Sequence, residues 1–147
     1  MFSTFDEAAA FVRDRGIRMV DLKFCDLWGR WHHLTLPGER FTRSLLERGV
    51  GFDGSAVGFK SVSAGDMVLR PDLAAAFVDP FHDVPTLSFA CSTYDAVTRQ
   101  AFPYDPRNLA RRAEECLAAS GIADRSVWGP EFEFYVFDGV AFENTLN

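Results

Sequence analysis

The sequence predicts an α+β fold in which a small sheet packs against a helix. Two observations lead to this fold class. Segments of alternating apolar and polar residues recur along the first part of the chain, as half-buried strands require. Separate stretches with apolar residues at helical spacing lie between and after them. A chain of 147 residues can bury a core without disulfides or metals, but it is too short for a complete (β/α)₈ barrel.

The composition excludes several classes of protein. With 48% apolar residues and a formal net charge of −6, the chain is globular and acidic, which does not favour a nucleic-acid partner. Its longest apolar run, residues 73–78, is far shorter than the ~18 residues of a membrane span. Its three cysteines are widely spaced and odd in number, which indicates reduced thiols. We therefore expect a cytoplasmic protein that binds neither nucleic acid nor membranes.

A short N-terminal helix over residues 3–15 and a β-hairpin are the first elements. Thr4 and Glu7 have the spacing of a capping box, which marks a helix start. Residues 19–24 then alternate between apolar and polar side chains. After a turn, residues 30–36 return as a second strand, so the two segments predict a hairpin.

The next elements complete a sheet around a second helix. Apolar spacing predicts that helix over residues 39–48, and strands are expected over residues 67–69, 74–78 and 86–94. Four or five strands around one helix give the outline of a β-grasp arrangement, the ubiquitin-like roll. Between them, residues 49–66 are rich in glycine and small polar residues, which favours a functional loop over a plain connector.

The chain changes character near residue 103, where a domain boundary is expected. Asp105 followed by Pro106 is typical of a helix N-cap and first helical residue. The apolar stripe that should be buried on this helix comprises Leu109, Ala113, Cys116 and Leu117. A final strand over residues 131–137, preceded by a short one over residues 126–128, is predicted to follow.

Two glutamates in that last strand are candidate metal ligands. Alternation places Glu131 and Glu133 on one face, about 7 Å apart along the strand. Two carboxylates at this separation repel each other when buried, and a hard divalent cation such as Mg²⁺ or Mn²⁺ removes that cost. The alternative interpretation is a solvent-facing strand edge with two ordinary glutamates.

Asp53 is the second candidate, because it lies in the glycine-rich loop beside an aromatic residue. A carboxylate there can bind an amine or an ammonium ion through charge and hydrogen bonds. The alternative is an Asx turn, since Asp-Gly is a common turn dipeptide. His32 and His33 also suggest a metal, but adjacent strand residues point to opposite faces, so structural roles are favoured.

Four motifs in order carry a resemblance to a known family. They are Phe-Asp-Gly-Ser at residues 52–55, Asp-Met-Val-Leu-Arg-Pro-Asp at residues 66–72, Asp-Pro-Arg at residues 105–107 and Gly-Pro-Glu-Phe-Glu-Phe at residues 129–134. Together they resemble glutamine synthetase of the bacterial type. The resemblance implies a β-grasp domain over residues 1–100, followed over residues 101–147 by an incomplete catalytic domain with its first helix and strand.

The resemblance also implies roles for single residues. Glu131 and Glu133 would ligate two divalent metals, Mg²⁺ or Mn²⁺. Asp53 would reach the neighbouring subunit's site in a ring of subunits and help to bind and deprotonate ammonium, with Ser55 and Phe59 at the substrate site. The implied reaction phosphorylates the γ-carboxylate of glutamate with ATP, and ammonia then attacks the γ-glutamyl phosphate to give glutamine.

Departures from the family pattern leave two other functions open. Ala56 stands where the family commonly has a second serine, and Phe59 where it often has tryptophan, which keeps open a γ-glutamyl-amine ligase of the same superfamily. The end of the chain at residue 147 keeps open a non-catalytic β-grasp module that assembles with full-length subunits. We expect little or no catalysis from this chain alone, because the implied nucleotide site and further metal ligands lie downstream in the family.

Overall fold

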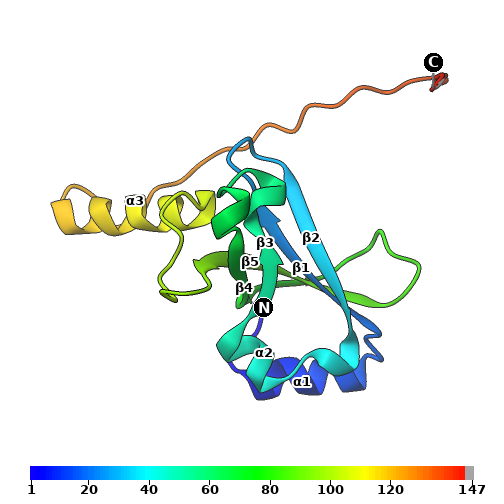
Figure 1. The fold of residues 1–147 in the computed structure, drawn as a ribbon, viewed down its shortest axis with the longest axis horizontal. Helices are drawn as coiled ribbons and strands as arrows, with labels where there is room; N and C mark the ends of the chain where they lie inside the picture. Colours follow the sequence, from blue (N-terminus) through cyan, green and yellow to red (C-terminus); the bar gives the residue numbers. More distant parts are fainter. Residues whose placement is uncertain (145–147) are drawn as a thin grey trace.

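A five-stranded sheet forms the centre of the computed structural model, which describes residues 1–144 (Figure 1). The strands are β1 (Met19–Cys25), β2 (Trp31–Pro37), β3 (Val50–Asp53), β4 (Asp66–Val78) and β5 (Thr86–Asp95). Their order in the sheet is β2-β1-β5-β4-β3. The central pair β1 and β5 runs parallel, whereas the remaining neighbours pair antiparallel. The α+β class and the hairpin predicted over residues 19–36 are confirmed.

The helices are α1 (Phe5–Asp14), α2 (Arg43–Arg48) and α3 (Pro106–Ser120), and the short 3₁₀ segments are η1 (Gly38–Arg40), η2 (Gly54–Val57) and η3 (Val62–Ala64). The predicted capping box starts α1: the Thr4 hydroxyl accepts a hydrogen bond from the Glu7 amide at 3.2 Å, and the Glu7 carboxylate accepts one from the Thr4 amide at 3.3 Å. No helix within residues 1–144 has the length and apolar character needed to cross a membrane.

The core lies between one face of the sheet and the helices α1 and α2 (Figure 1). Alternation along β1 buries Val20 and Leu22 completely, as predicted, and they join Leu87 and Phe89 of β5. Burial of such side chains stabilises the fold by about 1.5–3 kcal/mol each before entropy is counted. The buried side chains of the central parallel pair, β1 and β5, therefore contribute much of the stability of the sheet.

The structure differs from the predicted elements at three places in this domain. The helix expected over residues 39–48 is divided into η1 and the shorter α2, because Thr42 is extended and caps α2 through its hydroxyl. The strands expected over residues 67–69 and 74–78 form one continuous strand, β4, because a register shift between Pro71 and Ala76 absorbs the expected turn. The glycine-rich stretch contributes β3, which was not predicted. The alternation in β3 is short, with only Val50 and Phe52 on one face, and does not predict a strand by itself. The strand forms because the first residues of β4 pair with its backbone.

The predicted helix after β5 is present as α3, and Asp105 is its N-cap. One Asp105 oxygen accepts a hydrogen bond from the Arg107 amide at 3.0 Å, while the other accepts one from the Thr93 amide of β5 at 2.8 Å. The expected burial of the α3 stripe is wrong, since Leu109 is 43% exposed and Cys116 is also exposed. The helix is therefore tied to the sheet through its cap and not through its apolar face.

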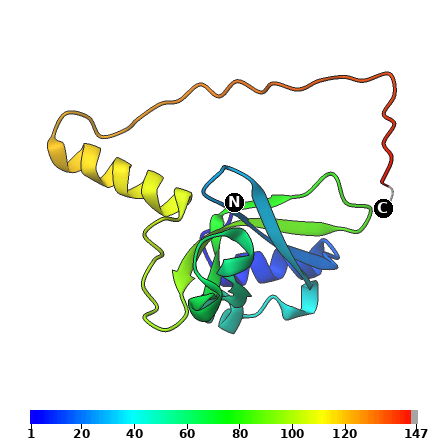
Figure 2. The ribbon, with the colours of Figure 1, turned by 45° about the horizontal axis from the view of Figure 1, so that its top comes forward.

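The strands predicted over residues 126–128 and 131–137 are also wrong. Residues 122–144 contain neither helix nor strand, and they run from the end of α3 past the sheet without joining it (Figure 2). A strand needs a neighbour to pair its backbone groups, and none lies beside this segment among the described residues. The described fold is therefore a mixed sheet with two covering helices, followed by α3 and an extended segment.

Candidate functional site

Asp53 stands at the junction of β3 and η2, where the strand presents it to solvent. Its carboxylate accepts a hydrogen bond from the Ser55 amide at 2.8 Å and so caps the 3₁₀ turn. Hydrogen bonding by Ser55, through its side chain and its amide, lowers the pKa of the Asp53 carboxyl below its usual value. Asp53 is therefore an exposed, ionised carboxylate on a short, ordered turn. The predicted Asx turn and the predicted cation-binding carboxylate are compatible, because only one oxygen makes this hydrogen bond.

Two glycines let the loop close around this carboxylate. A Cβ atom on Gly54 would lie 2.3 Å from the Met67 sulfur, and one on Gly65 would lie 2.4 Å from an Asp53 carboxylate oxygen. The Gly54 amide also donates to the Gly65 carbonyl at 2.7 Å, which joins the two ends of the loop. A larger residue at Gly65 would displace the Asp53 carboxylate, and one at Gly54 would displace the Met67 side chain, so glycine at both positions allows this loop conformation.

Phe59 anchors the loop in the hydrophobic core. Its ring is only 8% exposed and lies 5.2 Å from the Phe102 ring and 6.2 Å from the Phe24 ring, centroid to centroid. The next residue, Lys60, forms an ion pair with Asp95 at the end of β5. That ion pair and hydrogen bonds from the Thr98 amide and hydroxyl lower the pKa of Asp95 well below its usual value. The predicted substrate role of Phe59 remains a prediction, and in this structure its contacts are with other core aromatics.

Trp28 is a residue at this site that the sequence reasoning did not single out. Its indole is 69% exposed and lies against Gly58, where a Cβ atom would come within 3.0 Å of the ring. The β1–β2 turn holds it there, because the buried Asp26 accepts hydrogen bonds from the amides of Trp28 and Arg30 and from the His32 ring. The sequence signal that could have indicated it is a bulky aromatic within the turn Asp-Leu-Trp-Gly at residues 26–29.

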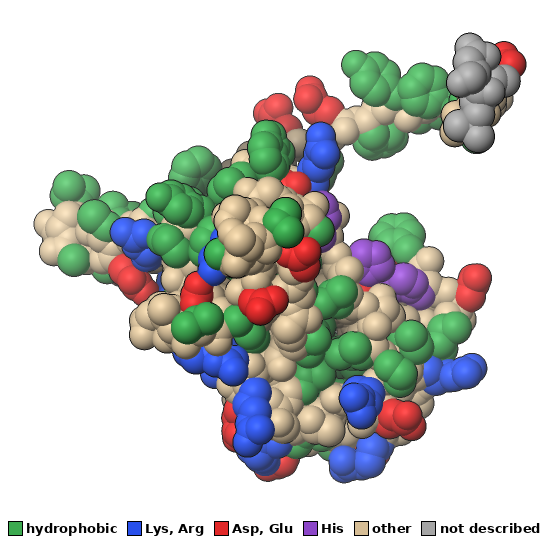
Figure 3. All heavy atoms as spheres, viewed as in Figure 1, with side chains coloured by type: hydrophobic (Ala, Val, Ile, Leu, Met, Phe, Trp, Pro, Cys, Tyr) green, Lys and Arg blue, Asp and Glu red, His purple; other side chains and the backbone are tan. Residues whose placement is uncertain are grey.

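Glu131 and Glu133 lie on the extended segment, away from any ligand partner. Both carboxylates are exposed, and the flanking Phe132 and Phe134 are 88% and 81% exposed. Figure 3 shows apolar side chains along this segment standing clear of the rest of the molecule. Among residues 1–144, no hydrogen bond, ion pair or group of metal-binding side chains joins either glutamate to Asp53. The two carboxylates alone do not make up a metal site.

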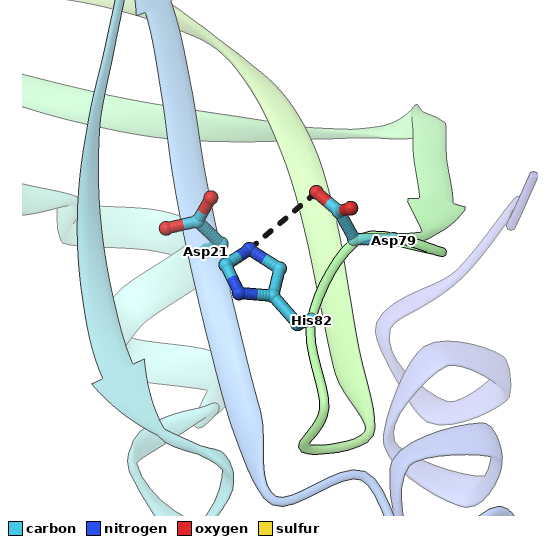
Figure 4. Close-up of side chains that lie close together, drawn as sticks. All are labelled: Asp21, Asp79 and His82. Carbon is cyan, nitrogen blue, oxygen red and sulfur yellow. Dashed lines mark ion pairs between the residues drawn. The ribbon is translucent and has the colours of Figure 1, made fainter. Parts of the chain in front are cut away.

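A different group of side chains has the spacing of metal ligands. Single oxygen or nitrogen atoms of Asp21, Asp79 and His82 lie within 4.8 Å of one another (Figure 4). Asp21 and Asp79 are buried, and the His82 ring lies 3.7 Å from the Asp79 carboxylate. However, the Lys23 ammonium already lies 2.7 Å from Asp79 and 3.5 Å from Asp21. Lys23 therefore supplies the cation in this group.

Further contacts indicate that this group is a structural ion-pair network. The hydrogen bond from Lys23 lowers the pKa of Asp79 to about 2, despite burial, with help from the Phe81 amide and the Ser88 hydroxyl. His33 and the Thr35 hydroxyl each lie 2.7 Å from the other oxygen of Asp21. His32 and His33 thus contact different carboxylates, as their opposite faces predict. The network ties β1 and β2 to the end of β4 and the start of β5.

Two family models match the chain. One, described as the beta-Grasp domain of glutamine synthetase, matches residues 16–96, and the other, described as the catalytic domain of glutamine synthetase, matches residues 103–147. The chain belongs to the glutamine synthetase family. The resemblance drawn from the four motifs and the β-grasp fold are thereby confirmed.

Similar proteins agree with this assignment to the glutamine synthetase family. The glutamine synthetase of Mycolicibacterium smegmatis is 43% identical over 145 residues, which cover 98% of this chain and 30% of that protein. That of Neisseria gonorrhoeae is 44% identical over 144 residues, which cover 95% of this chain and 30% of that protein. The solved glutamine synthetase of Plasmodium falciparum shares the fold with a TM-score of 0.73 and 17% identity, over 82% of this chain and 23% of that one. The chain thus spans about 30% of the length of these curated relatives.

Proposed function

We propose that this chain forms part of an enzyme that joins ammonia to the γ-carboxylate of glutamate with ATP, through γ-glutamyl phosphate. The observation that carries the proposal is the exposed, ionised Asp53 on a loop closed by glycines, in a chain of the glutamine synthetase family. We further propose a β-grasp domain over residues 1–100 and the beginning of the catalytic domain over residues 101–147.

Asp53 is proposed to bind ammonium and to accept one of its protons. The charge of the carboxylate attracts the cation, and its free oxygen can accept a hydrogen bond from it. Transfer of a proton to the carboxylate leaves ammonia with a lone pair for attack on the γ-carbonyl carbon, from which phosphate then departs. Ser55, whose amide fixes the carboxylate, positions it for this step.

Asp53 is proposed to serve the site of a neighbouring subunit in a ring. This explains why the loop is exposed and makes no contact with Glu131 or Glu133 within residues 1–144. The metal role of these glutamates stays a prediction, and the proposed step at Asp53 does not depend on it. The three cysteines are free thiols, which suits the reducing cytoplasm that we propose as the location.

A chimaera with a relative tests the proposal. Residues 1–147 replace the matching segment of the Mycolicibacterium smegmatis protein, and glutamine formation from glutamate, ATP and ammonium is measured. We expect activity, and we expect Asp53→Asn in the chimaera to lower kcat/KM for ammonium by about 10²–10³-fold, as for loss of a proton acceptor or an electrostatic contact.

The matched control is Asp83→Asn, because Asp83 is an exposed aspartate with no ion pair within residues 1–144. We expect it to leave kcat/KM unchanged. Circular dichroism and gel filtration confirm that each chimaera folds and assembles. Equal activity of the Asp53→Asn and Asp83→Asn chimaeras would refute the role of Asp53.

A γ-glutamyl-amine ligase is the second candidate. The side chain of Ala56 is exposed in η2, shortly beyond the end of β3, where a serine would add bulk and a hydroxyl. The same chimaera, assayed with ethylamine and with ammonium, decides between them. Preference for ethylamine by kcat/KM would establish the second candidate, and strict use of ammonium would remove it.

A further inference from the structure

A pocket of about 410 Å³ lies where the end of α2 meets β4 and β5. The residues that line this arginine pocket are Glu47, Arg48, Val68, Arg70, Tyr94 and Arg99. Its volume is within the range of small-molecule sites, ~300–1,000 Å³. The pocket shares no residue with the Asp53 loop, so its role is independent of the proposed reaction.

Two of the arginines donate hydrogen bonds from their guanidinium groups to backbone carbonyls of α2. Arg70 lies over the Tyr94 ring, 4.9 Å from its centroid, and donates a hydrogen bond to the Glu47 carbonyl at 2.7 Å. Arg99 donates to the Arg48 carbonyl at 3.4 Å. Arg99 also has φ +59°, the only positive φ of a residue other than glycine within residues 1–144. Such a conformation is strained for a residue with a Cβ atom and persists only where the surroundings impose it.

The charge of the arginine pocket is not balanced from within. Arg48, Arg70 and Arg99 take part in none of the ion pairs found among residues 1–144, whereas Arg43, Arg107 and Arg111 each have an acidic partner. Glu47 is the single acidic residue of the lining. Three guanidinium groups around one concavity repel each other, although the exposure of Arg48 and Arg99 lets solvent screen part of that repulsion.

A structural role in capping α2 accounts for only some of the hydrogen-bond donors of Arg70 and Arg99. Arg70 and Arg99 satisfy carbonyl groups at the C-terminal end of α2, which favours cations there. Each guanidinium has five N–H donors, and this contact takes one from each. The remaining donors are in the planar arrangement that binds phosphate or carboxylate oxygens in pairs.

We propose that the arginine pocket binds a small oxyanion with two negative charges. Together with Glu47, the anion balances the charges of the three guanidinium groups, and it accepts hydrogen bonds from their free N–H donors. A phosphate monoester and a dicarboxylate are both such anions. Inorganic phosphate is the probe for the first class and succinate is the probe for the second.

Isothermal titration calorimetry of the 147-residue chain tests the proposal. Inorganic phosphate and succinate are titrated separately, at an ionic strength held constant with chloride. We expect one or both to bind with a stoichiometry of one, and the stronger one identifies the class of anion. In Arg99→Gln we expect the affinity to fall by about tenfold or more, because a charge-assisted contact is lost.

Two further variants keep the test decisive. Arg48→Gln removes a guanidinium that makes no hydrogen bond within residues 1–144, so this variant should fold as the unmodified chain does. It replaces Arg99→Gln if that variant folds poorly, and it should weaken anion binding in the same way. Arg112→Gln, on the exposed surface of α3, is the matched control and should bind as the unmodified chain does. The proposal is overturned if neither anion binds, or if Arg48→Gln and Arg99→Gln bind as tightly as Arg112→Gln.

Discussion

Strand β5 and the segment after α3 have similar alternating sequences, yet their side chains have opposite environments. On β5, Leu87 and Phe89 are completely buried, whereas Phe132 and Phe134 are more than 80% exposed. β5 lies between β1 and β4, which pair its backbone on both sides, and no described strand lies beside residues 131–137. Alternation of apolar and polar residues thus separates the side chains onto two faces, but the apolar face is buried only where the segment pairs with neighbouring strands and joins the sheet.

Truncation of one aromatic in each region should give the largest contrast. We expect Phe89→Ala to lower the free energy of unfolding by about 3–5 kcal/mol, because it leaves a cavity among residues of β1, β5 and η1–α2. Phe134→Ala should change it by no more than about 0.5 kcal/mol, as for other exposed sites. Urea unfolding followed by circular dichroism measures both. Equal effects would show that the C-terminal segment is packed in solution.

The ion pair at the end of β4 should give the next largest effect. We expect Asp79→Asn to cost about 3 kcal/mol at pH 7, because Lys23 loses its nearest carboxylate in a buried network. The pKa of Asp79 is lowered to about 2 in the folded chain from 3.8. Its stabilisation is therefore fully present above about pH 5 and is lost as the pH falls from about 5 to 2.

Unfolding experiments between pH 7 and pH 2 follow this linkage. The difference in stability between the unmodified chain and Asp79→Asn should be constant down to about pH 5 and should shrink toward pH 2. Asp83→Asn, on the same connection between β4 and β5, serves as the control and should show no such difference. A gap between Asp79→Asn and the unmodified chain that does not depend on pH would contradict the assigned cause.

The N-cap of α1 should give the smallest of these effects. Thr4→Ala removes the hydroxyl that accepts from the Glu7 amide, and we expect a loss of about 1 kcal/mol. Thr4→Ser keeps the hydroxyl and should restore most of the stability. A midpoint of urea unfolding that is the same in Thr4→Ala and Thr4→Ser would mean that the capping box contributes nothing measurable.

Local signals in the sequence predicted much of the fold correctly. The capping box at Thr4, the N-cap at Asp105 and the alternation around Leu22 each specify an element through contacts between residues close in the chain. The continuity of β4 through Pro71 was missed, because its partner residues on β5 lie about twenty residues further along. The same limit explains why a strand over residues 131–137 was predicted and is not formed.

At the candidate site, too, some residues could be predicted from the sequence and others could not. Asp53 was recognised from its loop, but its contact with Gly65 and the position of Trp28 against Gly58 depend on segments far apart in the sequence. His32 and His33 were assigned correctly to opposite faces, whereas their partners Asp26 and Asp21 follow only from the β1–β2 register. The arginine pocket gave no sequence signal, since Arg48 lies in α2, Arg70 in β4 and Arg99 in the connection after β5.

Ordered motifs, capping residues and short-range periodicity were enough to specify the family, the β-grasp outline, the starts of α1 and α3 and the loop that presents Asp53. Three other properties depend on the folded chain: which apolar faces are buried, that Lys23 neutralises Asp79, and that three arginines meet in one pocket. These properties arise from hydrogen bonding between strands, burial and charge pairing, and all three depend on neighbours in space that local sequence patterns do not specify.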